Sequence, residues 1–556
     1  MKRSPRGHRR APERAWPGSV GWGFALLVSS VLWWAYSQVR WPSGLLGWIV
    51  WVPFFVCVQN SRSWRQAAAL CVIFPACFVA VTFPWFAGAV AEYVGLPWLL
   101  SLGAMVVVSP LLQLPCLAAG AVVWATRKCE KQPAGLIARV LLVSGTYVGV
   151  ELAVPKALGD TIGQGLLANP LLAQAADLCG VHGLTFLLVA GNMFLASAFV
   201  WLQCDSTQSM RRAFVRVAAA GAGIASLAGY GMMRWQAFAP RSAQPPIVAG
   251  VVQGNLSHYD RLRAERGTYG AVRMILDRYF DLTRLGRSPE VDFWVWPETV
   301  YPTTFGQPKS EAGAEFDAEI LKFVEQLDRP LVFGAYDRDD GGEYVAAFFV
   351  WPEAGKPRVG GVYRKAAPFP FTERVPGWVD SLGLRLWAPW LGTWRPGGGA
   401  RVVEIPRPEG RAIRVLPLLC YDALWAEYAD FGARHGADLL LVLSNDSWFS
   451  EGRGLWLPLV GSAFRSLETR RPQVRVTPTG MTALVSARGE IQILVPPGKS
   501  GVARAYLDWP AQEEVTWAVR LRGWPALIVL AGLPLGAGGG LAWFARRMSR
   551  RKFALQ

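Results

Sequence analysis

The sequence predicts a multi-pass α-helical membrane bundle joined to an α/β domain outside the membrane, and three observations predict it. The chain of 556 residues is 52% hydrophobic and contains 27 Trp, and long apolar runs account for this content. Basic residues gather on one side of these runs. From Ile247 onward, short β-type runs alternate with helical segments, which is typical of a layered α/β domain.

Eight apolar runs are predicted to span the membrane. The second is short, and the fifth contains Glu151, so the end of the fifth is expected to face protein rather than lipid. The predicted spans are Trp22–Val39, Leu45–Val58, Ala67–Val90, Trp98–Ala125, Ala138–Val154, Val181–Leu202, Val215–Trp235 and Trp524–Phe544.

The basic residues predict the orientation of the chain. They lie before the first run and after the second, fourth, sixth and eighth, so both termini are expected in the cytoplasm and residues 236–520 outside. The formal net charge of +17 arises in these flanking segments, and nucleic-acid binding is therefore not expected. The first run has no small-residue cleavage site, which favours an uncleaved helix over a signal peptide.

These patterns divide the chain into five predicted parts. They are a cytoplasmic tail at 1–19, a seven-span bundle at 20–238, an outer domain at 246–515, an eighth helix at 520–546 and a second tail at 547–556.

The outer domain is predicted to contain eight strands and four helices. The strands are Ile247–Gln253, Val291–Trp296, Pro330–Tyr336, Ala346–Trp351, Arg414–Cys420, Asp438–Asn445, Gln473–Thr477 and Ala483–Ala487. The helices are Asp260–Leu285, Glu311–Leu327, Trp425–His435 and Trp456–Thr469.

Three strand ends in this domain carry reactive side chains: Glu298, Lys365 and Cys420. Together they make a set for acyl transfer, in which a thiolate attacks a carbonyl, a carboxylate moves the proton, and a cation with a backbone N–H stabilises the oxyanion. A lysine within about 6 Å of the sulfur is expected to favour the thiolate over the thiol.

Cys420 stands apart from the other seven cysteines, which all precede residue 205. It has neither a disulfide partner nor a CxxC companion in its domain, and a small buried core residue is the alternative interpretation. The four histidines show no motif, so neither a metal nor a cofactor is expected.

The segments Trp296-Pro-Glu298, Lys365 and Cys420-Tyr-Asp422, in this order, resemble the Glu-Lys-Cys triad of the carbon–nitrogen hydrolase (nitrilase) superfamily. That resemblance implies an α-β-β-α sandwich. A domain of this kind between seven spans and an eighth is similar to the apolipoprotein N-acyltransferases of bacterial envelopes. Further similar phrases are Val252-Gln-Gly-Asn255, Ser444-Asn-Asp-Ser-Trp-Phe449, Ala463-Phe-Arg-Ser-Leu-Glu468 and Asn169-Pro-Leu-Leu.

The resemblance implies a ping-pong reaction. Cys420 takes a fatty acyl chain from a phospholipid as a thioester, and the chain then passes to the α-amino group of the N-terminal diacylglyceryl-cysteine of an apolipoprotein. Glu298 is the implied general base and Lys365 the implied stabiliser of the tetrahedral intermediates. The implied supporting residues are Glu373, which positions the lysine, Tyr421 with its N–H as an oxyanion donor, Asp422 and Asn445.

The resemblance also implies a location and partners. The protein is expected in the bacterial plasma (inner) membrane with its catalytic domain on the periplasmic side. Its partners are the phospholipid donor, the diacylated prolipoprotein acceptor and the bilayer, and a monomer is predicted.

The chain departs from the family pattern at three places. The segment Lys365-Ala-Ala-Pro-Phe-Pro-Phe371-Thr-Glu373 lacks the usual His, Leu and Gly, Asp422 replaces a Glu, and Trp456 is followed by Leu457-Pro458. A diverged paralogue with another amine acceptor is therefore one alternative.

Two aromatic segments predict contact with lipid, because Trp at such density suits a membrane interface. The candidate residues are Trp378, Trp387, Trp390, Trp448, Phe449 and Trp456. The alternative is that they cover the core of the sandwich or pack on the membrane helices.

Two further functional hypotheses remain open. A membrane-tethered amidase would use the same triad with water as the acceptor, but it does not explain eight spans. A transporter or scaffold with a degenerate outer domain is opposed by the intact triad and by the scarcity of charge inside the spans.

Overall fold

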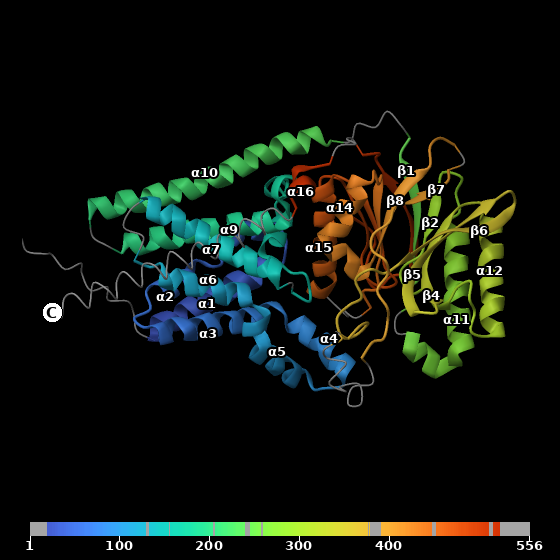
Figure 1. The fold of residues 1–556 in the computed structure, drawn as a ribbon, viewed down its shortest axis with the longest axis horizontal. Coiled ribbons are helices and arrows are strands. Elements are labelled where there is room, and N and C mark those ends of the chain that lie inside the picture. The colour runs from blue at the N-terminus through green and yellow to red at the C-terminus, as the bar shows by residue number, and fades with distance from the viewer. Residues whose placement is uncertain are drawn as a thin grey trace, which may run out of the picture.

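The computed structural model describes residues 19–128, 133–154, 156–203, 206–239, 245–256, 259–375, 377, 391–407, 409–447, 452–510 and 515–522. Figure 1 shows the helices of the N-terminal half as a bundle on the left and the strands as two stacked sheets on the right. Helices α14 (Ala426–Arg434) and α15 (Arg453–Thr469) lie between the bundle and the sheets.

Helices occupy each of the first seven predicted spans, singly or in pairs. They are α1 (Ser19–Tyr36), η1 (Ser43–Trp48), α2 (Val52–Gln59), α3 (Trp64–Thr82), α4 (Pro84–Val94), α5 (Trp98–Leu112), α6 (Leu114–Ala125), α7 (Pro133–Ala153), α9 (Ala176–Leu202) and α10 (Thr207–Ala237). The short elements η3 (Ile162–Ala168) and α8 (Pro170–Ala173) connect α7 to α9.

Four helices in the described part of the chain, α3, α7, α9 and α10, are long and apolar enough to cross a membrane. The pair α5 and α6, bent by 52°, passes the same test together, and α1 and the η1–α2 pair are shorter apolar segments. The eighth predicted span lies outside the described residues. The eight-span topology therefore stays a prediction.

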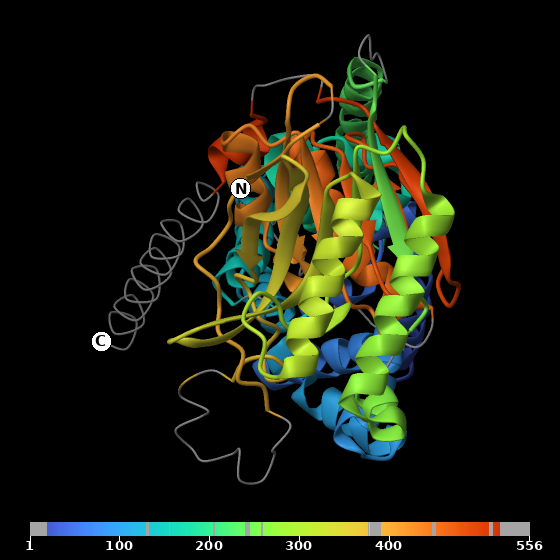
Figure 2. The same ribbon diagram turned by 90° about the vertical axis from the view of Figure 1, so that its right-hand side faces the viewer.

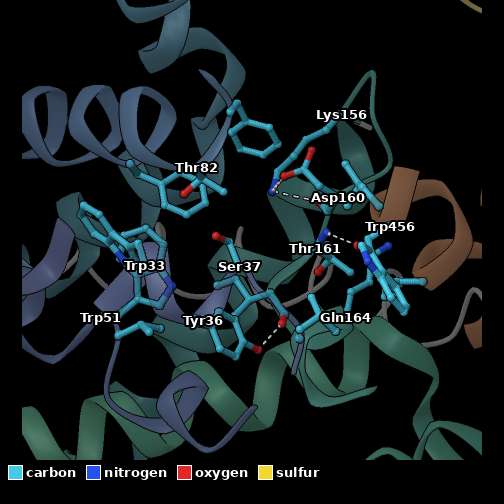
Figure 3. A pocket seen from close by; sticks show the side chains of 18 of the residues that line it. Trp33, Tyr36, Ser37, Trp51, Thr82, Lys156, Asp160, Thr161, Gln164 and Trp456 are labelled. Atoms are coloured by element: carbon cyan, nitrogen blue, oxygen red, sulfur yellow. Dashed lines mark hydrogen bonds and ion pairs between the residues drawn. The ribbon is translucent and has the colours of Figure 1, made fainter. Parts of the chain in front are cut away.

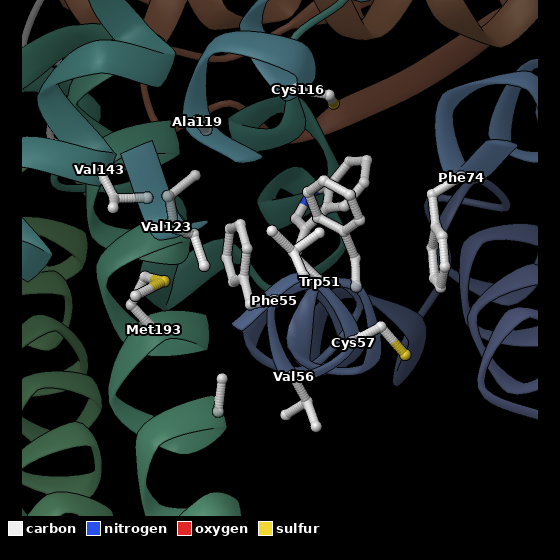
Figure 4. Close-up of a cluster of buried hydrophobic side chains, with 14 of the residues drawn as sticks. Trp51, Phe55, Val56, Cys57, Phe74, Cys116, Ala119, Val123, Val143 and Met193 are labelled. Atoms are coloured by element: carbon white, nitrogen blue, oxygen red, sulfur yellow. The ribbon is translucent and has the colours of Figure 1, made fainter. Parts of the chain in front are cut away.

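The third predicted span is not one helix but two, because α3 ends at Thr82 and Pro84 begins α4. Proline has no N–H for an intrahelical bond, and the first turn is the position where a helix tolerates it. Large apolar side chains fill the bundle interior, where Trp51 and Phe55 of the α2 region lie between Phe74 of α3 and Met193 of α9 (Figure 4).

The C-terminal half folds into two sheets. The first has the order β13-β1-β2-β4-β5-β6, with β3 paired to β4, and the second has the order β12-β11-β10-β9-β8-β7. The strands are β1 (Ile247–Gln253), β2 (Phe293–Val295), β3 (Tyr301–Thr304), β4 (Leu331–Asp339), β5 (Gly342–Glu353), β6 (Lys356–Arg364), β7 (Val403–Ile405), β8 (Ile413–Leu419), β9 (Leu439–Leu443), β10 (Gln473–Val476), β11 (Thr482–Val485), β12 (Ile491–Val495) and β13 (Gly501–Leu507).

Successive side chains of β1 point to opposite faces of the first sheet, so this strand contributes to two apolar layers. Ile247, Ala249 and Val251 pack against the second sheet, whereas Val248 and Val252 pack against α11 (Tyr259–Gly286). Helices α11 and α12 (Glu311–Leu327) cover the outer face of the first sheet (Figure 2), and α14 and α15 cover the second. The predicted α-β-β-α sandwich is confirmed.

The α15 layer joins the sandwich to the bundle. Val460 and Phe464 of α15 share an apolar cluster with Leu184 and Leu188 of α9. Strand β8 ends near this junction, and a short 3-10 helix, η5 (Cys420–Leu424), follows it directly. The turn that begins at Cys420 therefore lies next to α15, the helix that contacts the bundle.

Candidate active site

Glu298 is delivered by the turn that follows β2. The backbone N–H of Gly334 on β4 donates to Pro297 O at 3.1 Å. A Cβ at Gly334 would lie 2.6 Å from the Cα of Glu298, so glycine is required for β4 to approach the turn this closely. The Glu298 side chain is buried, with 3% of its surface exposed.

Lys365 follows β6 and is held at both ends of its backbone. Its N–H donates to Val345 O at 2.8 Å, and its carbonyl accepts from the N–H of Gly397 at 2.7 Å. The ammonium Nζ donates to Glu298 Oε1 at 3.0 Å and to Glu373 Oε1 at 2.7 Å. Lys365 thus joins the buried carboxylate of Glu298 to the partly exposed carboxylate of Glu373.

Glu373 also shapes the loop between itself and the lysine. Its Oε2 accepts a hydrogen bond from the backbone N–H of Phe369 at 2.6 Å. The carboxylate therefore bridges the Lys365 ammonium and the loop backbone.

Cys420 is the first residue of η5 and has a positive φ of 47°. A left-handed conformation is uncommon for a residue with a side chain, and its occurrence is often associated with a functional site. The parallel pairing of β8 with β9 places Cys420 at the carboxyl edge of the second sheet. Part of the residue is exposed, whereas its sulfur, a free thiol, lies in a buried environment.

Asp422 links the turn that begins at Cys420 to the loop that follows Lys365. Its Oδ2 accepts hydrogen bonds from the Tyr363 hydroxyl at 2.8 Å and the Leu419 N–H at 3.1 Å. Its Oδ1 accepts from the Ala367 N–H at 2.6 Å. The residue is fully buried. Asp422 therefore sets the position of η5 relative to the segment that carries Lys365.

Burial is the largest influence on the ionisation of the site. It raises the pKa of Glu298 to about 7, although the Lys365 ammonium lowers it. Burial also raises the pKa of Asp422 to about 6. For Lys365, burial lowers the pKa, but the carboxylates of Glu298 and Glu373 outweigh this effect and hold it well above its usual range.

The Lys365 ammonium lowers the pKa of the Cys420 thiol, as its charge predicts, but two other influences outweigh it. Burial, reinforced by the Glu298 carboxylate, raises the pKa of the thiol to about 12, and the lowering by Lys365 is smaller. The thiol is thus protonated at neutral pH. It needs a base, and Glu298 has a pKa suited to that task.

The other predicted supporting residues occupy different places. The ring of Tyr421 lies edge-on to Phe369, with centroids 5.0 Å apart. In the described part of the chain, Asn445 accepts hydrogen bonds from Ser447, from its N–H at 3.2 Å and from its hydroxyl at 2.7 Å. Asn445 therefore stabilises the turn after β9. The two glutamates of the site are bound by Lys365.

The aromatic candidates are only partly described. Trp378, Trp387, Trp390, Trp448 and Phe449 lie outside the described residues. Trp456 lies on α15 and lines a cavity between the sandwich and the bundle (Figure 3).

Sequence reasoning missed the contribution of the membrane half. Lys156 Nζ lies 3.0 Å from Glu151 Oε1 and 3.3 Å from Asp160 Oδ2. The loop held by this ion cluster rests on η5, since a Cβ at Gly159 would lie 3.2 Å from the Leu424 Cβ. The sequence signal was Glu151 alone, which pointed to a protein-facing position without indicating its partners.

The described part of the chain gathers no set of side chains that could bind a metal ion. No three His, Cys, Asp or Glu side chains there are grouped to hold a metal ion. His182 instead contacts Glu151 Oε2 at 3.2 Å, and His435 stacks on Phe431 with centroids 3.8 Å apart.

Two family models match the chain. The model of the apolipoprotein N-acyltransferase N-terminal domain matches residues 28–194, and the carbon-nitrogen hydrolase model matches residues 218–515, more than half of the chain. An apolipoprotein N-acyltransferase of Bdellovibrio bacteriovorus is 26% identical over 472 residues, 82% of each chain. One of Sinorhizobium medicae is 29% identical over 380 residues, 64% of this chain and 66% of the relative.

A search of solved structures finds an amidase from Nesterenkonia sp. with a TM-score of 0.36 and 15% sequence identity. The alignment covers 50% of this chain and 94% of the amidase. The two family matches confirm the resemblance that the residues predicted.

Proposed function

The chain belongs to the carbon–nitrogen hydrolase family, and from this membership we propose that it is an N-acyltransferase acting on apolipoproteins. It transfers a fatty acyl chain from a phospholipid to the α-amino group of an N-terminal diacylglyceryl-cysteine. The observation that carries this proposal is Lys365, held between Glu298 and Glu373 at 3.0 and 2.7 Å, in a domain packed on an apolar helix bundle. The match of that bundle to the N-acyltransferase N-terminal domain supports it.

In the first half-reaction, Glu298 takes the proton from the Cys420 thiol as the sulfur attacks an ester carbonyl of the phospholipid. The oxyanion forms near the Lys365 ammonium, whose positive charge stabilises it. When the intermediate collapses, the carbon–oxygen bond breaks and Glu298 returns the proton to the leaving alcohol. The products are a lysophospholipid and an acyl thioester on Cys420.

In the second half-reaction, the acceptor amine attacks the thioester carbonyl. Glu298 accepts a proton from the nitrogen, and the carbon–sulfur bond breaks to give the amide. Glu298 then passes the proton to the leaving sulfur, which restores the Cys420 thiol and the Glu298 carboxylate. A Glu298 pKa of about 7 allows the same carboxylate to act as base and acid near neutral pH.

The remaining residues position this machinery. Glu373 holds the Lys365 ammonium, Asp422 holds the turn at Cys420 against the lysine loop, and the Tyr421 N–H is the proposed second oxyanion donor. Asn445 supports the turn after β9.

We place the protein in the bacterial plasma membrane as a monomer with both termini in the cytoplasm. The apolar helices and the N-acyltransferase relatives support a membrane location. The distribution of basic residues supports the orientation, with the sandwich on the periplasmic side.

The test is intact-mass measurement of purified protein incubated with phospholipid. Wild type is expected to gain one acyl chain that hydroxylamine releases, and Cys420→Ala is expected to gain none. Cys179→Ala is the matched control, because Cys179 is another partly exposed free thiol and should leave the adduct unchanged. Adding a diacylated lipopeptide should then remove the chain from Cys420 and extend the peptide by its mass.

Two results would contradict the proposal. Hydrolysis of small amides without a lipid adduct would favour a membrane-tethered amidase. A transporter or scaffold would be favoured if the wild-type protein showed neither activity and its loss caused growth defects that Cys420→Ala does not cause.

A further inference from the structure

The turn that carries Glu298 is a bulge between two strands that lie in line. Strands β2 and β3 both pair in parallel with β4, and they follow one another along the same side of it, because β5 pairs along the whole of its other side. Val295 pairs with Val332, and Tyr301 pairs with Ala335. The chain takes six steps from 295 to 301, where β4 takes only three from 332 to 335. The extra residues are looped out of the sheet, and Glu298 is among them.

The backbone of the bulge is held against β4. The Trp296 N–H donates to Val332 O at 2.8 Å, and the Gly334 N–H donates to Pro297 O at 3.1 Å. A Cβ at Gly334 would lie 2.5 Å from the nitrogen of Thr299, so the backbone of β4 lies directly beneath the turn. Strand β4 therefore sets the position from which the bulge begins.

Thr299 is the residue that turns the chain back toward β3, and its φ is 57°. This is the left-handed region, which glycine adopts readily and which is an outlier for a β-branched residue. The Thr299 hydroxyl forms no hydrogen bond with another described residue, so a side-chain bond does not account for the threonine. The residue is strained, and its own bonds do not explain the strain.

Strained backbone gathers in the segments that form the site. In the described part of the chain, eight residues other than glycine have a positive φ. Three of them lie in these segments: Cys420 itself, Thr299 next to Glu298, and Phe371 two residues before Glu373. A conformation of this kind persists only where the surrounding structure imposes it, and such residues cluster at functional sites.

We propose that Thr299 is a positioning residue for the general base, and that its constrained backbone holds the Glu298 carboxylate at the Lys365 ammonium. The inference rests on the proposed function, in which Glu298 moves the proton, and extends it to the residue beside the base. Glu298 keeps its 3.0 Å hydrogen bond from Lys365 Nζ only while the bulge keeps its shape. A β-branched residue has fewer accessible backbone conformations than glycine, so threonine lets the turn relax less.

The charges around Glu298 show why its position needs to be fixed. Burial disfavours the charged carboxylate, and the carboxylates of Glu373 and Asp422 repel it, while Lys365 attracts it. The Cys420 thiol is the remaining titratable group that faces it. In a flexible turn, the Glu298 side chain would gain water by swinging away from Lys365. The constrained bulge opposes that movement.

The test is Thr299→Gly, which allows the same φ but frees the turn. The rate of thioester formation is expected to fall by up to about 10²-fold, because a misplacement of about 1 Å has this order of cost. The midpoint of its pH profile should move below 7, since burial raises the pKa of Glu298 to about 7 and a hydrated carboxylate loses this effect. The unfolding temperature should not fall, because glycine adopts this conformation without strain.

Two further variants separate the causes. Thr299→Val removes the hydroxyl and keeps the β-branch, so the pH midpoint near 7 should remain. Ala354→Gly is the matched control for relief of strain, because Ala354 has a φ of 51° in the hairpin between β5 and β6. That hairpin lies at the end of β6 opposite to Lys365, so the variant should keep the wild-type rate and pH profile.

Hydrogen exchange keeps this inference separate from the proposed function, since it needs no catalysis. The Gly334 N–H bonds to the bulge, and its exchange, followed by mass spectrometry, should be faster in Thr299→Gly than in wild type or Thr299→Val. That result supports the constrained turn even if no thioester forms. Equal exchange in the three proteins, an unchanged rate and midpoint in Thr299→Gly, or an equal loss of rate in Thr299→Val would overturn the proposal.

Discussion

The carboxylate of Asp422 accepts a 2.6 Å hydrogen bond from the backbone N–H of Ala367, and this bond ties the turn at the nucleophile to the loop after Lys365. The two segments come from different sheets, since β6 belongs to the first and β8 to the second. The distance between the thiol and the ammonium is therefore set by a contact across the sandwich.

Asp422→Asn is expected to slow thioester formation and to lower stability by about 1–3 kcal/mol. The amide has one acceptor oxygen and an NH₂ group that would face backbone N–H donors, so at least one buried donor loses its partner. Unfolding in detergent and the rate of acyl-adduct formation measure the two effects. Unchanged values for both would show that the cross-link is not needed to position Cys420.

Thioester formation is expected to rise with pH through about 7. Glu298 has its pKa raised to about 7, and it acts as a base only when it is deprotonated, so activity is lost as the pH falls below that value. The observed midpoint belongs to the cluster of Glu298, Lys365 and Glu373 together. Rates of adduct formation between pH 5.5 and 8.5, a range of about 1.5 units on each side of this pKa, measure the profile.

Glu298→Gln is the companion variant. It should reduce the rate by about 10²–10⁴-fold and remove the rise near pH 7, because the amide cannot accept the thiol proton. A variant that kept the wild-type pH profile would exclude Glu298 as the group that titrates.

Lys365→Met is expected to abolish acylation and to destabilise the fold by about 3 kcal/mol or more. It leaves the buried Glu298 and the partly exposed Glu373 without this counter-charge, and removing one partner of a buried pair has this order of cost. Thermal unfolding checks the stability. Lys309→Met is the control, since its ion pair with Glu343 is about half exposed and should contribute less than about 1 kcal/mol.

Arg470→Met is expected to loosen the junction between sandwich and bundle. Arg470 Nη2 lies 2.7 Å from Asp177 Oδ2, both side chains are 1% exposed, and Arg470 also donates to Gln174 Oε1 at 2.7 Å. Loss of the arginine leaves Asp177 with one guanidinium partner, Arg234, and should cost about 3–5 kcal/mol.

Limited proteolysis and thermal unfolding of Arg470→Met measure this effect. Arg358→Met removes an exposed pair with Glu353 and should change neither readout. Equal behaviour of the two variants would argue that apolar packing of α15 alone holds the junction.

The outer domain shows which kinds of strand can be predicted from a sequence. All eight predicted strands appear in the structure, and each has a neighbour on both sides, as β1, β2, β4, β5, β8, β9, β10 and β11. The five that were not predicted are the four sheet edges, β6, β7, β12 and β13, and β3, which pairs only with β4. Edge strands are partly exposed and mix polar with apolar residues, so they lack the continuous apolar run by which buried strands are recognised.

The same reasoning applies to the site. Glu298, Lys365 and Cys420 could be predicted because each follows a strand and carries the side-chain chemistry that acyl transfer requires. The contacts of Asp422 and the ion cluster around Lys156 could not be predicted. No periodic sequence pattern relates the residues that these contacts bring together.

The apolar helices, the interior strands and the three candidate site residues could be predicted from the sequence, since periodicity, strand ends and residue chemistry are local properties. How these parts act on one another depends on the folded arrangement. Burial raises the pKa of Cys420 to about 12 despite the nearby lysine, and packing of the two halves places the Lys156 loop against the turn that begins at Cys420. Burial and proximity depend on segments that are distant in the chain, and no local pattern encodes them.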